Sequence, residues 1–170
     1  MFTALLRQGV ITDRLDGVKI NTTGGLGQEK SMTNFRNAIT ITSDAALEAL
    51  SAAVAHAKSM NVPQCIFIVD LSGETLASVK MDGAKYLSMH TARAKARTAA
   101  SINSATGSVP PEAGLAAGIA SQGGVTQMPG GLPIRFGGVL AGGIGVGSGT
   151  GDQDFEVARA ALAAIGADAV

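Results

Sequence analysis

The sequence LAGGIGVG, residues 140–147, decides how this chain folds. Read as a strand, it alternates its side chains between two faces. One face is nearly bare and consists of Ala141, Gly143, Gly145 and Gly147. The other carries Leu140, Ile144 and Val146, which suit a hydrophobic core. Glycine inside a strand usually marks a place where another backbone or a flat ligand comes close. Two interpretations follow: a helix of the same chain packs here, or the bare face is a subunit contact or ligand wall.

The segments before this strand predict alternating helices and strands. A helix should begin after Thr42 or Ser43 and end before Pro63, with a buried stripe of Leu47, Leu50, Val54 and Ala57. Apolar runs over 64–70 and 75–81 read as strands joined by a turn. A second helix is predicted over roughly 87–103, where alanine is frequent. Residues 107–130 read as a long irregular segment, of a length that is often functional.

The segments around and after this strand complete the fold prediction. Two strands after Pro133 should be joined by a turn at Gly137-Gly138. Thr150 and Gln153 form a capping-box pattern for a last helix. That helix should bury Ala158, Ala161, Leu162 and Ile165. The order α-β-β-α-β-β-α predicts an α+β fold, with an antiparallel sheet of about four to five strands flanked by helices.

Length and composition restrict the class of protein. The 170 residues suit one domain, predicted over 39–170 and preceded by an N-terminal extension or arm over 1–38. Lys and Arg together number 13, as do Asp and Glu, so the net charge is zero. Such a chain has no long-range electrostatic field that would attract nucleic acid. No secretory signal or membrane-spanning run is recognised, so we expect a cytoplasmic protein without nucleic-acid or membrane partners. The single cysteine, Cys65, should act as a small buried hydrophobe.

Two groups of residues are candidates for binding. His56 lies on the first predicted helix, beside the small residues Ala45, Ala49 and Ala52, which leave room for a flat partner such as haem. His90, Arg93 and Arg97 share one face of the second helix and could hold a carboxylate or a haem propionate. Lys95 points elsewhere, beside Thr91 and Thr98. For both groups an ordinary surface helix face is the alternative interpretation.

Known cofactor-binding and catalytic motifs are not found in the sequence. The glycine run contains no G-x-G-x-x-G register and is followed by too few residues for the rest of a dinucleotide-binding unit. No Ser-His-Asp spacing or H-E-x-x-H cluster is present. From chemistry alone, the sequence predicts a small-ligand-binding α+β domain.

Several segments together resemble the GlcG/HbpS family, which also occurs as the C-terminal domain of PduO-type proteins. They are VDLSGE (69–74), KMDGA (80–84), AKARTA (94–99), GGLPI (130–134), GGIGVGSG (142–149) and QD (153–154). The resemblance covers roughly residues 42–167 and implies a helix-flanked antiparallel sheet that assembles into homo-oligomers. It also implies that haem is a possible cofactor. In PduO-type domains a histidine of the first helix is the haem ligand, and His56 falls on that element.

Two functions are therefore predicted, and a purely structural or accessory subunit, an oligomer without an occupied pocket, is a third possibility. The first is an oligomeric binding protein for haem or another small molecule, with His56 as iron ligand and Arg93, Arg97, Gly131 and Pro133 around the cofactor. The alternative is an isomerase, lyase or hydrolase acting on a small organic acid in a catabolic pathway. In that case Asp82 is the base, Arg93 holds the substrate carboxylate, and amides near Gly131 stabilise negative charge. An enzyme should also show buried paired polar groups with shifted pKa values, in a cleft formed by residues 107–130.

Overall fold

The computed structural model describes residue 34 and residues 37–170 of the chain. The predicted N-terminal arm, residues 1–38, lies almost wholly outside the described residues. Residues 37–170 form one compact unit. Its elements are α1 (Ser43–Ser59), β1 (Cys65–Asp70), β2 (Thr75–Lys80), α2 (Ser88–Ile102), α3 (Pro111–Ala120), β3 (Gly131–Phe136), β4 (Val139–Gly147) and α4 (Gly151–Ala164). The predicted α+β class and the antiparallel sheet are confirmed.

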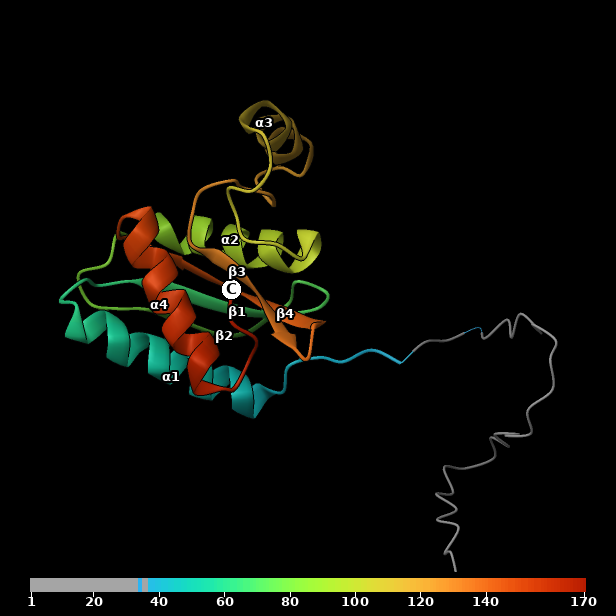
Figure 1. Ribbon diagram of the computed structural model, residues 1–170. Helices are drawn as coiled ribbons and strands as arrows, with labels where there is room; N and C mark the ends of the chain where they lie inside the picture. The colour runs from blue at the N-terminus through green and yellow to red at the C-terminus, as the bar shows by residue number, and fades with distance from the viewer. Residues whose placement is uncertain (1–33, 35–36) are drawn as a thin grey trace, which may run out of the picture. The chain divides into compact units, whose positions relative to one another are not determined.

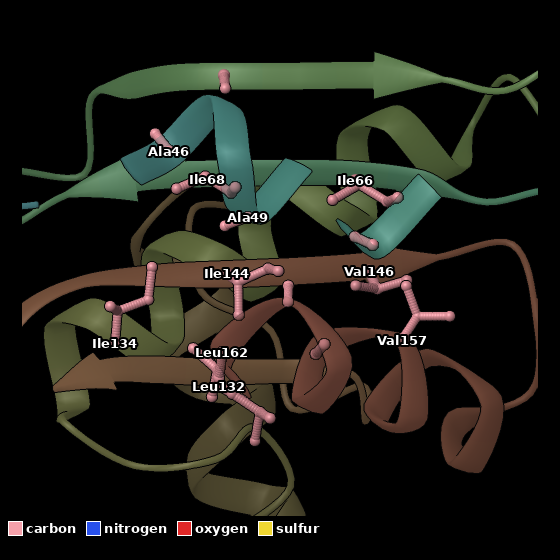
Figure 2. Close-up of a cluster of buried hydrophobic side chains, with 14 of the residues drawn as sticks. Ala46, Ala49, Ile66, Ile68, Leu132, Ile134, Ile144, Val146, Val157 and Leu162 are labelled. Carbon is pink, nitrogen blue, oxygen red and sulfur yellow. The ribbon is translucent and has the colours of Figure 1, made fainter. Parts of the chain in front are cut away.

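The four strands form one antiparallel sheet in the order β2-β1-β4-β3. Helices α1 and α4 cover one face of it and α2 covers the other (Figure 1). The larger core lies under α1 and α4, where Ile66, Ile68, Ile144 and Val146 meet side chains of both helices (Figure 2). The smaller core lies under α2 and includes Cys65, so the thiol is a buried hydrophobe as predicted.

The bare face of β4 packs against α2 of the same chain. A Cβ atom at Gly143 or Gly145 would collide with the α2 backbone, at Ala96 and at Ala92 respectively. Glycine removes the side-chain layer that normally separates a helix from a sheet, so α2 lies unusually close to β4. Helix packing is therefore the correct interpretation of these two glycines. Ala141 is an exception, because it is the unpaired residue of a bulge against β3 and joins the larger core.

The predicted buried stripe of α1 is wrong by about a quarter turn, except at Ala57, which is buried as predicted. The fully buried positions are all alanine, namely Ala46, Ala49, Ala53 and Ala57. Leu47 is 58% exposed, and Leu50 and Val54 are half-buried at the edge of the contact. Small residues let α1 approach both α4 and the sheet closely, so that the alanines rather than the leucines form the contact face.

Residues 107–130 are more regular than predicted, because they contain the ten-residue helix α3. Pro111 occupies the first turn, where a missing N–H is tolerated. Helix α3 stands beyond α2, away from the sheet (Figure 1), and leaves Leu115 66% and Ile119 73% exposed. The capping box at Thr150 and Gln153 is present as predicted. Across the described part of the chain, no helix has the length and apolar character needed to cross a membrane.

Candidate functional site

The outer face of α2 carries a cationic hollow, defined by His90, Arg93 and Arg97. These side chains line one cavity of about 450 Å³, closed on its far side by the turn over residues 121–124. Both arginines are exposed, and within the described residues neither makes an ion pair or a side-chain hydrogen bond. Arg97 also lies over the turn between β1 and β2, beside Gly73. Two unpaired guanidinium groups are thus available to a ligand that carries carboxylates.

An apolar surface adjoins the cationic hollow. Helix α3 and the segment after it line a cavity of about 470 Å³. Leu115, Ile119 and Val125 contribute to this cavity, and Gly123 lines both it and the cationic hollow. A ligand with one charged edge and a broad apolar body could therefore contact both surfaces at once.

His56 lies on the opposite face of the sheet from this hollow. It projects from α1 toward α4, where its Nε2 is 3.0 Å from Oε1 of Glu156. The two side chains are 32% and 57% exposed, so the pair is open to solvent. Because the sheet separates α1 from α2, His56 and the two arginines of one chain cannot contact the same ligand. Only residues from two copies of the chain could do so.

The other predicted site residues are dispersed. Asp82 lines a cavity of about 470 Å³ between α1 and β2, together with Lys58 and Asn61, and this cavity does not include Arg93. Gly131 and Pro133 are buried in β3. The Gly131 amide already donates to Thr106 Oγ1 at 2.9 Å, which leaves it no hydrogen for an oxyanion. The structure therefore does not assemble Asp82, Arg93 and Gly131 into a catalytic site, and Gly131 and Pro133 offer no free group to a cofactor.

A buried ion pair was not predicted from the sequence as a pair. Lys95 Nζ lies 2.7 Å from Asp154 Oδ2 and 2.7 Å from the Val146 carbonyl oxygen, and both side chains are only 3% exposed. Burial raises the pKa of Asp154 above its ordinary value, against the opposing effect of Lys95. The signal in the sequence was Lys95 itself, a lysine on the alanine-rich side of α2. Its partner, 59 residues away, could not be identified without the fold.

The ion pair lies at the base of a cavity of about 510 Å³. The wall is formed by Lys85, Tyr86, Leu87, Ser88, Thr91, Met128, Ser148 and Gly149. A buried polar pair and a raised pKa thus occur together here, but of residues 107–130 only Met128 lines the cavity, so this is not the cleft predicted from that segment. Within the described residues, no group of three or more His, Cys, Asp and Glu side chains could hold a metal ion.

Comparison with known proteins identifies relatives of this architecture. A family model described as "Haem degrading protein HbpS-like" matches residues 41–163. Corrinoid adenosyltransferase PduO of Citrobacter freundii is 38% identical over 120 residues, which cover 67% of this chain and 36% of PduO. The chain thus spans about a third of the length of that relative.

Two solved structures share the fold. Klebsiella pneumoniae protein ORFY has a TM-score of 0.73 and 31% identity, over 79% of this chain and 97% of that one. A PduOC:haem complex has a TM-score of 0.71 and 31% identity, over 77% of this chain and 99% of that one. Both likenesses extend over nearly all of the solved chains.

Proposed function

The chain belongs to the HbpS-like family, and on this premise we propose that it is a small-ligand-binding protein whose ligand is haem. The observation that carries the proposal is the cationic hollow beside the apolar surface of α3. A structural relative has been crystallised as a haem complex, which supports the same ligand class. Haem has one part for each surface: charged propionates for the cationic hollow and an apolar ring for the surface of α3.

The two surfaces would divide the ligand between them. Arg93 and Arg97 would pair with the propionates, because a guanidinium group binds a carboxylate through two parallel hydrogen bonds. Leu115 and Ile119 would cover part of the apolar ring and lose their exposure to water. Haem would supply an iron atom with a coordination position for an imidazole.

The chain has only two histidines that could provide this imidazole. His90 lines the cationic hollow itself, and His56 lies across the sheet. We propose His56 of a second copy as the ligand. Its present partner, Glu156, is an exposed carboxylate, and exposed ion pairs of this kind contribute only about 0–1 kcal/mol. Release of His56 from Glu156 would therefore cost little free energy.

Titration of the protein with hemin tests the imidazole assignment. We expect His56→Ala to shift the Soret band of the complex and to weaken binding, because the iron loses its nitrogen ligand. His90→Ala should leave the position of the band unchanged. If His90→Ala alone shifts the band, the assignment to His56 is wrong. If neither variant alters the spectrum, no imidazole coordinates the iron.

The same titration tests the propionate contacts. The double variant Arg93→Ala/Arg97→Ala should weaken hemin binding about tenfold, since exposed charged hydrogen bonds are lost. Lys80→Ala is the control, because Lys80 is an exposed cation on β2 that lines neither the cationic hollow nor the apolar surface. Equal affinities for the two variants would remove the cationic hollow from the proposal.

Assembly into homo-oligomers is part of the proposed function. It would bring His56 of one copy toward the hollow of another and would cover the apolar face of α3. Light scattering after gel filtration should give several times the 17.0 kDa mass of the chain. A monomer at micromolar concentration, with hemin bound, would contradict this arrangement. Cytoplasmic location stays a prediction from the sequence.

A further inference from the structure

We propose that the cavity above Lys95 and Asp154 is a second binding site, which takes a small organic acid that also carries a hydroxyl or carbonyl oxygen. The site shares only Met128 with the apolar surface assigned to haem and no residue with the cationic hollow. Ser88, Thr91 and Lys95 recur at helical spacing on one face of α2, whereas the cationic hollow occupies another face. The cavity of about 510 Å³ has the size of small-molecule sites in proteins.

The base of the cavity has unused hydrogen-bonding capacity. An ammonium group has three N–H donors, and Lys95 uses two of them, toward Val146 and Asp154. The third is available to an oxygen atom in the cavity, which Lys95 lines. A ligand oxygen would thus meet an ammonium group with one donor that the described residues leave unused.

Stability is a weak explanation for this ion pair, although Asp154 also accepts a hydrogen bond from the Gly149 N–H at 3.1 Å. Two charges buried together lose their hydration, and apolar residues of similar volume are often as stabilising or more so. Most of the other buried side chains are apolar, and no other charged side chain is buried among the described residues. A charged pair that opens onto a cavity is therefore better explained by a ligand than by packing.

The wall of the cavity indicates the class of ligand. The Lys95–Asp154 pair has no net charge. The remaining charged side chain of the lining is Lys85, so the cavity carries one net positive charge. Tyr86, Leu87 and Met128 are more than half exposed and form an apolar rim. These features favour an anion with an apolar body. Its carboxylate would lie near Lys85, and its second oxygen would accept from Lys95.

Mandelate is a suitable probe, because it combines a carboxylate, a hydroxyl group and a phenyl ring. Isothermal titration calorimetry with the full chain should show saturable binding. Phenylacetate lacks the hydroxyl and 1-phenylethanol lacks the carboxylate, and each should bind about tenfold more weakly. Absence of saturable mandelate binding, or equal binding of all three compounds, would overturn the proposal.

Two further variants locate the binding. Lys95→Met/Asp154→Asn removes both charges together and should fold, as judged by circular dichroism. It should lose at least tenfold in mandelate affinity and retain hemin binding. Met128→Trp should obstruct the cavity and weaken mandelate binding, whereas Val139→Trp, an exposed apolar position on β4, should not. Unchanged mandelate affinity in both the double variant and Met128→Trp would overturn the site. Substitutions of His56 or Arg93 that abolish hemin binding should leave the mandelate affinity unchanged.

Discussion

Replacement of Gly145 by alanine should lower the free energy of unfolding by about 3 kcal/mol or more. The added Cβ would collide with backbone atoms of Ala92 and Ala96, which cannot move aside as a flexible side chain could. Relief of the collision requires α2 to shift away from β4, and such a shift opens the smaller core. Urea denaturation followed by circular dichroism measures the change.

Gly147→Ala is the matched control for this prediction. Gly147 lies on the same face of the same strand, but a Cβ there would be 3.4 Å from the Ser88 oxygen and 3.5 Å from the Ala92 Cβ. These are ordinary van der Waals distances, so the loss of stability should stay within about 0.5 kcal/mol. Equal losses for the two variants would show that close approach of α2 is not the reason for glycine in this strand.

The single variant Lys95→Met should lose about 3–5 kcal/mol, because it leaves Asp154 as an unpaired charge in the interior. The double variant Lys95→Met/Asp154→Asn should recover most of this loss, since no buried charge remains. Urea denaturation of wild type, both single variants and the double variant gives the coupling energy between the two positions. A double variant as unstable as Lys95→Met would contradict the explanation.

Acid pH provides an independent readout for the same variant. Burial already raises the pKa of Asp154 in the folded protein, and removal of Lys95 should raise it further. A carboxyl group with a raised pKa binds its proton more tightly in the folded state than in the unfolded state. The loss of stability in Lys95→Met should therefore be largest well above that pKa and shrink as pH falls through it. A loss that does not depend on pH would indicate a packing defect instead.

Local patterns were sufficient to predict the strands and helix α4. The β-branched run at 65–70, the turn at Gly137-Gly138 and the capping box at Thr150 each depend on neighbouring residues. Helix α3 was missed because Gly114 and Gly118 interrupt its pattern, although they permit contact with Gln127 and Val125. The stripe of α1 was misplaced because hydrophobicity ranks leucine above alanine, whereas close helix packing favours the smaller residue.

The candidate sites depended more strongly on the fold. The sequence placed His90, Arg93 and Arg97 on one helix face, and helical spacing alone brings them to one hollow. Spacing could not show that the sheet separates His56 from the arginines, or that the Gly131 amide is already occupied. Each of these facts depends on which faces of the sheet the helices cover.

The sequence by itself determined the class of fold, the order of all the elements except α3, and the need for a close partner along the glycines of β4. Only the tertiary structure decided that this partner is α2 and that Lys95 meets Asp154 beneath a cavity. The physical reason is the range of the interactions. Turns, caps and helical faces arise within a few residues, whereas the buried ion pair joins positions 59 residues apart through the packing of two helices and a strand.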